Sequence, residues 1–384
     1  MTVTSPGGFT AAGVAAGLKK SGGEDVALVV NNGPRFEAAG VFTSNRVQAA
    51  PVLWSRQVLA GGGPLRAVIL NSGGANACTG PRGFQNTHAT AERVAVLLDV
   101  GAASVAVCST GLIGEHLPME RLLPGVDRAV ASLAPDGGAD AAKAIMTTDS
   151  VPKSVVVDGG GYSVGGIAKG AGMLAPGMAT MLCVLTTDAV VDSSTADRAL
   201  REACRVSFDR LDSDGAMSTN DTVLLMASGA ADVIPDAEAF TGAVTEACMN
   251  LSRQLLSDAE GATKEVAITV TGAADEADAV TVARAVARNN LVKCALFGED
   301  PNWGRILAAV GTTDAVFEPD NLDVAVNDVW ICRSGAAAAD RSTVDLSGRE
   351  VSITVALGAG DQHATVWTND LSHAYVHENS AYSS

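Results

Sequence analysis

A threonine at a predicted loop–strand junction is the residue of this sequence with the clearest capacity for chemistry. Thr180 follows the run KGAGMLAPGMA, which is rich in small residues, and precedes the apolar run MLCVL, which is typical of a β-strand. If the bond between Ala179 and Thr180 were cut, Thr180 would become an N-terminus. Its free α-amino group, with an ordinary pKa of about 7.7, would then be the base that activates its own hydroxyl. Threonine also opens many strands because of its β-propensity, so the pattern alone leaves both interpretations open.

The region before this junction, from Asp158 to Gly177, is the only long glycine-dense stretch of the chain. Self-cleavage would begin with attack of the Thr180 hydroxyl on the Ala179 carbonyl, an N-to-O acyl shift, and would end with hydrolysis of the ester. Glycine permits the strained backbone that such a shift needs. A plain surface loop explains the same glycine density.

A second candidate nucleophile is Ser163, in the run GYSVG. The run matches the Gly-x-Ser-x-Gly pattern of α/β hydrolases, and a downstream base is available in His363, His373 or His377. That pattern requires a helix after the serine. The glycines at positions 165, 166, 170 and 172 disfavour a helix there, so we do not expect Ser163 to act as a nucleophile.

Two further motifs match only in part. The run SVPK from Ser150 satisfies the Ser-x-x-Lys pattern of penicillin-binding enzymes, but Pro152 and the valines after it indicate a strand instead of a helix. The run from residue 209 to 221 resembles a calcium-binding EF-hand loop. Aligning Gly215 with the invariant glycine of that loop puts Arg210 at the first ligand position, so calcium binding is not expected.

Metal, disulfide and nucleotide sites are not expected either. The seven cysteines are scattered and include no Cys-x-x-Cys pair, and His373 and His377 have no companion ligand. The chain contains no Gly-x-x-x-x-Gly-Lys-Ser/Thr loop, and no Gly-x-Gly-x-x-Gly follows a predicted strand. No cofactor is implied.

Composition narrows the class of protein. The chain has 384 residues, of which 47% are hydrophobic and 18% charged, which suits a substantial core and two or three domains. Its net charge of −17 disfavours nucleic acid and anionic membranes as partners. The N-terminal run lacks the features of a signal peptide, and no apolar run reaches the roughly 20 residues of a membrane-spanning helix. We therefore expect cytoplasmic small-molecule chemistry.

Short apolar runs alternate along the chain with stretches of helical periodicity, which predicts an α/β fold. Strands are expected over residues 25–30, 67–70, 104–108, 154–157, 178–186, 222–227, 351–356 and 364–368. Helices are expected over residues 89–98, 118–133, 195–208, 236–260 and 274–289. We expect a layered sheet-and-helix core over residues 1–235 and a smaller mixed α/β domain over residues 236–384.

Seven segments between residue 25 and the C-terminus carry a family resemblance. They are LNSGGANACTG, CSTGLIGEHLP, AIMTTDSVPK, KGAGMLAPGMATMLCVLTTDA, STNDT, EGATK and LVKCALFGEDPNWGRI. Together they resemble the ornithine acetyltransferase (glutamate N-acetyltransferase) family of arginine biosynthesis. Because the segments span essentially the whole chain, the resemblance is far more specific than any single motif.

The resemblance implies a reaction and an assembly. The acetyl group of N2-acetyl-L-ornithine would pass to L-glutamate through an ester on Thr180, with no cofactor. Self-cleavage would give an α fragment of residues 1–179 and a β fragment of residues 180–384, which share one core and pair as α2β2. Three alternatives stay open: acetyl-CoA as a second donor, which would make the enzyme bifunctional; an autoprocessing amidohydrolase or aminopeptidase, in which water takes the acyl group; and an uncut, non-catalytic binding protein.

The resemblance also implies roles for particular residues. Thr110 and Gly111 match the family's oxyanion hole, where a hydroxyl and a backbone N–H face the developing negative charge. A turn after the strand expected at 104–108 explains the same Ser-Thr-Gly run. The residues matching the family's substrate-binding positions are Thr147, Lys169, Thr180, Glu260, Asn379 and Ser384.

The chemistry of these side chains suits an amino-acid substrate. A fixed cation, Lys169, and a fixed acceptor, Glu260, complement the carboxylate and the amino or amide groups of such a molecule. Thr147 has a neighbour, Thr148, that fits the same position almost as well. The tail departs from the family pattern, because Glu378 stands where an apolar residue is usual and Ser384 where threonine is common.

Overall fold

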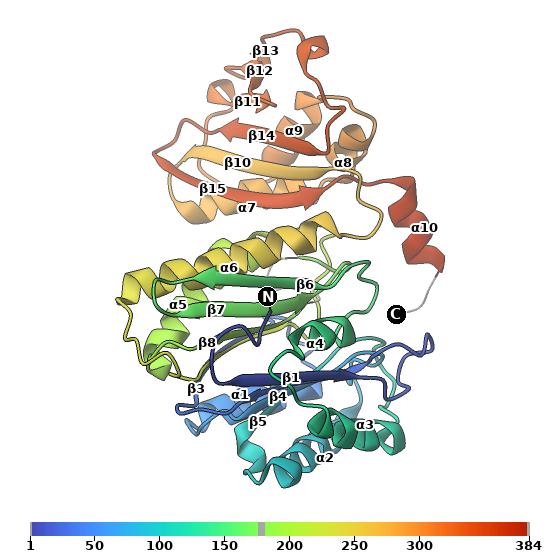
Figure 1. The fold of residues 1–384 in the computed structure, drawn as a ribbon. Coiled ribbons are helices and arrows are strands. Elements are labelled where there is room, and N and C mark those ends of the chain that lie inside the picture. Colours follow the sequence, from blue (N-terminus) through green and yellow to red (C-terminus); the bar gives the residue numbers. More distant parts are fainter. Residues whose placement is uncertain (1, 176–180, 382–384) are drawn as a thin grey trace.

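A computed structural model describes residues 2–175 and 181–381 of the chain. Two β-sheets and the helices around them form the larger part of the molecule, and a third sheet lies beyond them (Figure 1). The first sheet has the order β1-β2-β4-β5 and the second the order β3-β9-β8-β7-β6. The first sheet contains β1 (Phe9–Val14), β2 (Val26–Asn31), β4 (Ala67–Asn71) and β5 (Val105–Ser109). The second contains β3 (Glu37–Phe42), β6 (Lys153–Asp158), β7 (Ser163–Lys169), β8 (Leu182–Thr187) and β9 (Thr222–Ala227).

The burial of β8 shows how the two sheets are joined. All six of its residues are buried, and successive side chains enter different hydrophobic cores because side chains alternate across a strand. Leu182 and Val184 share a cluster with Val68 and Leu70 of the first sheet. Cys183 and the other alternate residues of β8 face away from that sheet. The inner faces of the two sheets therefore pack against each other.

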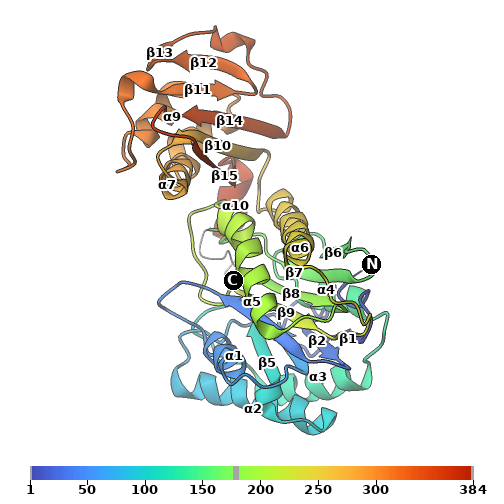
Figure 2. The same cartoon turned by 90° about the vertical axis from the view of Figure 1, so that its left-hand side faces the viewer.

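Helices cover the outer faces of both sheets (Figure 2). Helices α2 (Gly80–Leu98) and α3 (Met119–Ala131) pack on the first sheet, and α5 (Ser193–Val206) and α6 (Ala237–Ser257) pack on the second. Shorter helices α1 (Ala50–Ala60) and α4 (Gly138–Ala144) pack mainly on β5 and β1. The order of layers is helix, sheet, sheet, helix, which confirms the α/β class predicted from the sequence.

The second sheet mixes residues from both sides of the proposed cleavage point. Strand β8 pairs antiparallel with β7 and parallel with β9. Strands β3, β6 and β7 precede residue 179, whereas β8 and β9 follow residue 180. Both predicted fragments therefore contribute to one core, as expected.

The third sheet has the order β13-β12-β11-β14-β10-β15 and carries helices on one face. In β14 the side chains of Val351, Ile353 and Val355 are buried and alternate with more exposed ones, the pattern of a sheet covered on one side. Its strands are β10 (Glu265–Ala273), β11 (Asp323–Val326), β12 (Val329–Arg333), β13 (Ala336–Ala337), β14 (Glu350–Ala356) and β15 (Gln362–Asn369). Its helices are α7 (Glu276–Ala287), α8 (Asn290–Phe297) and α9 (Trp303–Val310).

The remaining elements are short. A last helix, α10 (His373–Ala381), follows β15 and extends from the third sheet toward the second (Figure 1). Single turns of 3₁₀-helix occur at Ala102–Ser104, Phe208–Arg210, Pro319–Asn321 and Arg341–Thr343.

Helix α6 belongs to the core of the second sheet. Phe240, Val244 and Leu251 of this helix pack with residues of β7, β8 and β9, and a separate cluster begins at Val266 in β10. This packing favours a division of the chain between α6 and β10. The domain boundary near residue 236 stays a prediction.

The glycine-dense region contains a strand where a surface loop was the simpler interpretation. β7 crosses it, and two of its glycines make room for neighbouring elements. A side chain on Gly165 would begin 2.7 Å from Pro6, and one on Gly166 would begin 3.2 Å from Leu251 of α6. These glycines serve close packing, so their density does not mark a loop.

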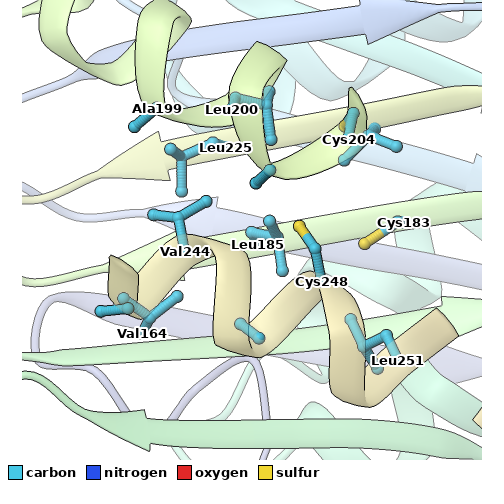
Figure 3. Close-up of a cluster of buried hydrophobic side chains, with 14 of the residues drawn as sticks. Val164, Cys183, Leu185, Ala199, Leu200, Cys204, Leu225, Val244, Cys248 and Leu251 are labelled. Carbon is cyan, nitrogen blue, oxygen red and sulfur yellow. The ribbon is translucent and has the colours of Figure 1, made fainter. Parts of the chain in front are cut away.

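We expect Leu251→Ala to lower the free energy of unfolding by about 2–5 kcal/mol, because a fully buried leucine leaves a cavity. Figure 3 shows Leu251 among the side chains that join α5 and α6 to the second sheet. Urea titration would measure the change. Leu291→Ala is the matched control, since that side chain is 62% exposed. Equal losses in the two variants would contradict the assignment of Leu251 to the core.

Candidate active site

One cavity gathers most of the residues that the sequence singled out. Six of them line it, and Ala179, Thr180 and Ser384 lie outside the described residues. The residues come from strand ends, loops and α10, which are far apart in sequence. The six are Thr110, Gly111, Thr147, Lys169, Glu260 and Asn379.

Thr110 and Gly111 leave the end of β5 in a fixed turn. The Thr110 N–H donates to the Asn71 carbonyl (2.9 Å), and the Gly74 N–H donates to the Thr110 carbonyl (3.0 Å). Gly111 has a φ of +129°, and a Cβ there would lie 2.5 Å from the Gly74 nitrogen. Only glycine fits this position without moving the backbone.

Lys169 ends β7 and is almost fully buried. Its Nζ donates to the Thr110 Oγ1 (3.2 Å), which joins the predicted carboxylate-binding cation to the predicted oxyanion hole. Burial lowers the pKa of Lys169, because an ammonium loses its hydration in the interior, while the carboxylate of Asp149 acts in the opposite direction.

Glu260 is held in place from three sides. Its N–H donates to the Ala171 carbonyl (2.9 Å), and its Oε1 accepts from the Thr148 hydroxyl (2.7 Å). A Cβ on Gly172 would lie 2.6 Å from the carboxyl group, so a larger residue at this position would displace the Glu260 carboxylate. Thr148 therefore supports Glu260 directly, whereas the Thr147 hydroxyl is 3.5 Å from an oxygen of Asp149.

Sequence reasoning assigned no role to the segment Ser218–Asn220, which also lines the cavity. The Asn220 amide donates to the carbonyls of Ala75 (2.6 Å) and Ser109 (2.8 Å) and so fixes the segments on both sides of the turn at Thr110 and Gly111. The run STNDT, one of the seven family segments, was the signal that marked this region. Its contacts are more than a hundred residues apart in sequence, so the sequence alone did not show the role.

The chain directly after Thr180 is anchored to Asp221, the residue that follows this segment. The N–H of Met181 donates to Asp221 Oδ1 (3.1 Å), and Met181 is buried. Burial also raises the pKa of Asp221 well above its usual range.

The last helix closes one side of the cavity through Asn379. The N-terminus of α10 is fixed by Ser372, whose hydroxyl accepts from the Tyr375 N–H (3.0 Å) and donates to the Gly261 carbonyl. The Asn379 amide donates to the Tyr375 carbonyl one turn earlier (3.0 Å). Asn379 thus reaches the cavity from a short helix that is docked beside Glu260.

The motifs around Ser163 and Lys153 lie outside this cavity. Ser163 opens β7, and its N–H donates to Asp188 (2.7 Å), so the residue is followed by a strand instead of the helix that a hydrolase serine needs. Lys153 opens β6, which covers the strand expected over residues 154–157. Among the described side chains, His, Cys, Asp and Glu nowhere gather in a group of three that would hold a metal ion. Within the same residues, every helix is too short or too polar to span a bilayer.

Comparison with known proteins agrees with the motifs. The model of the ArgJ family matches residues 10–384. The chain is 65% identical over 384 residues to the arginine biosynthesis bifunctional protein ArgJ of Streptomyces avermitilis and 63% identical to that of Streptomyces coelicolor, with full coverage of both partners in each case. It is also similar to the solved structure of ornithine acetyltransferase from Mycobacterium tuberculosis complexed with ornithine. The two sequences are 62% identical, the match covers 46% of this chain and 94% of that chain, and the TM-score is 0.45. The chain therefore belongs to the ArgJ family of arginine-biosynthesis acyltransferases, which confirms the family predicted from its segments.

Proposed function

We propose that the chain cuts itself between Ala179 and Thr180 and that Thr180 is then the nucleophile of an acetyl transfer. One observation carries this proposal: the residues assigned to the oxyanion hole and to amino-acid binding line one cavity, although they come from both sides of the proposed cut. Two described neighbours of the cut also support it. Met173 lines the cavity, and Met181 is fixed by its bond to Asp221.

The proposed reaction is a ping-pong transfer in two half-reactions. In the first, the Thr180 Oγ attacks the acetyl carbon of N2-acetyl-L-ornithine, the amide C–N bond breaks, and L-ornithine leaves with the proton taken from the hydroxyl. In the second, the amine of L-glutamate attacks the acetyl ester, N-acetyl-L-glutamate leaves, and the proton returns to Thr180. The free α-amino group of Thr180 carries the proton in both steps.

Thr110 and Gly111 would stabilise the tetrahedral intermediate. The Thr110 hydroxyl accepts a hydrogen bond from the Lys169 ammonium and can still donate its own proton. That arrangement makes the hydroxyl a stronger donor toward a developing oxyanion. The N–H of Gly111 would be the second donor, fixed by a backbone that only glycine tolerates.

Lys169 and Glu260 would bind the amino-acid part of each substrate. Lys169 supplies a buried positive charge for a carboxylate, and Glu260 supplies a buried acceptor for an amino group. Ornithine, which is bound in the mycobacterial structure, has both a carboxylate and amino groups. Asn379 and Ser384 of the tail would complete the pocket.

We expect Thr148→Val to raise KM for N-acetyl-ornithine by roughly 10- to 100-fold, because Glu260 loses a hydrogen bond to a charged group that is worth about 1.5–3 kcal/mol. Steady-state kinetics would measure the change. Thr241→Val is the matched control, because that hydroxyl only donates to the Ala237 carbonyl within α6. An unchanged KM for Thr148→Val would show that Glu260 does not bind the substrate.

The two processed fragments are proposed to stay together and to pair as α2β2 in the cytoplasm. The shared second sheet supports the association of the fragments, because β7 and β8 form adjacent strands across the cut. A bifunctional enzyme that also takes acetyl from acetyl-CoA is the second candidate. The names of the relatives from Streptomyces, which describe a bifunctional protein, favour it.

Intact-mass spectrometry tests the proposal directly. The purified wild-type protein is expected to give two fragments split at the bond between Ala179 and Thr180. Incubation with N-acetyl-ornithine alone should add one acetyl group to the fragment that begins with Thr180, and added glutamate should remove it as N-acetylglutamate. Release as acetate would show the hydrolase alternative instead, and the same adduct from acetyl-CoA would show the second donor. A single uncut chain without an adduct would contradict the central claim.

A further inference from the structure

A buried carboxylate next to the cavity makes contact with several of its walls. The side chain of Asp149 is completely buried. Its Oδ1 accepts from the Gly170 N–H (2.6 Å) and from Lys153 Nζ (2.7 Å), and its Oδ2 accepts from the Thr147 N–H (2.9 Å). Asp149 thus fixes the backbone at one end of the Thr147–Thr148 pair and the backbone directly after Lys169.

Lys153 connects Asp149 to a further segment, the one that carries Glu260. It is fully buried, and its Nζ also pairs with Asp258 Oδ2 (2.6 Å). Asp258 accepts in addition from the Ser150 N–H (3.0 Å) and stands two residues before Glu260. One ammonium therefore connects the loop before β6 with the loop after α6.

Stability is a poor explanation for this arrangement. Burying an ion pair costs several kcal/mol per ion in hydration, and well-packed apolar residues are often equal or better in its place. The network lies where the segments that carry Thr148, Lys169 and Glu260 meet. Its position suggests that it serves the site and not only the core.

We infer that Asp149 is a positioning residue that holds the substrate-binding segments in register and adds a buried negative charge near Lys169, with Lys153 as its support. The inference rests on the proposed function, because it acts through Lys169 and Glu260. Asp149 does not itself line the cavity.

The charges around Lys169 affect its protonation in opposite directions. Asp149 is the strongest charge that favours the protonated ammonium against the cost of burial, and Asp221 and Glu260 act in the same direction. Lys153 acts against it, and Lys19 is a second neighbouring cation. Although burial opposes ionisation of Asp149 as well, Lys169 and Lys153 hold its pKa below the usual range.

Asp149 and Lys153 act on the pKa of Lys169 in opposite directions, so their variants should shift the pH profile in opposite directions. A purely structural role would not produce such opposite shifts. Lys169 must be protonated to bind a carboxylate, so kcat/KM should fall as pH rises through its pKa. Asp149→Asn removes the main favourable charge, so the alkaline limb of kcat/KM for N-acetyl-ornithine should move to lower pH. Lys153→Gln removes a repelling charge, so the limb should move to higher pH. At pH 7, Asp149→Asn should also lose on the order of 10²-fold in kcat/KM through misplacement of the segments.

Controls separate the possible failures. Asp140→Asn removes an exposed carboxylate that bonds Lys143 and should leave the profile unchanged. Thermal unfolding and the extent of self-cleavage report whether each variant is folded. If Asp149→Asn does not fold, the direction of the limb in Lys153→Gln decides alone. A wild-type protein without acetyl transfer would contradict the proposed function, whereas an active wild type whose limb stays in place in the folded variants would overturn the inference.

Discussion

Thr180→Ala is expected to yield one uncut chain of about 38.7 kDa with no measurable acetyl transfer. The substitution removes the hydroxyl that would both cut the Ala179 bond and form the acetyl ester. Removal of the nucleophile in a protease lowers kcat on the order of 10⁶-fold, which indicates the size of the effect. Intact-mass spectrometry of the variant beside the wild type measures the first outcome, and an assay for N-acetylglutamate measures the second.

Thr180→Ser is the matched variant, because it keeps a hydroxyl at the same position. We expect it to be cut and to retain part of the activity. If Thr180→Ala were still split at the same bond, or still formed an acetyl adduct, another residue would be the nucleophile.

Thr110→Val should lower kcat by about 10²- to 10³-fold, which is the effect of removing one donor from an oxyanion hole. Self-cleavage should slow as well, because attack on the Ala179 carbonyl would form a similar oxyanion in the same place. The variant also takes an acceptor from Lys169 Nζ, so a smaller rise in KM is expected. Steady-state kinetics and a time course of fragment formation after synthesis measure these effects.

Thr110→Ser keeps both the donor and the acceptor and should restore most of kcat. A loss in Thr110→Val that is confined to KM would assign the hydroxyl to substrate binding alone. Loss of both functions in Thr110→Ser would show that the methyl group, and hence packing, matters more than the hydroxyl.

The strands of the two-sheet core were predictable where both of their faces are apolar. β9 occupies the expected residues 222–227, and β8 begins at Leu182 within the expected range 178–186, of which residues 178–180 lie outside the described part. A continuous apolar run between turns is the pattern of a strand buried on both sides. β7 was not predictable in the same way, because its glycines are selected by the neighbours Pro6 and Leu251 and not by strand propensity.

The candidate site was predictable as a set of residues but not as an arrangement. The family segments indicated Thr110, Lys169 and Glu260, and the structure brings them to one cavity. The support of Glu260 by Thr148 joins residues 112 positions apart, and a local pattern does not contain such a contact. Lys153 shows the same limit: its Ser-x-x-Lys pattern suggested a different enzyme class, whereas its contacts place it in the ion network around Asp149.

The adjacency of β7 and β8 has a consequence for the life of the molecule. If the chain is cut between them, the two strands remain paired from Val164 opposite Thr187 to Lys169 opposite Leu182, although no covalent link joins them any longer. The mature protein would then refold as a reaction of two molecules, with a yield that depends on concentration, whereas its precursor folds as one. Unfolding by heat or denaturant would therefore be reversible before cleavage and much less reversible after it. The uncut chain is the form that has to reach the native state.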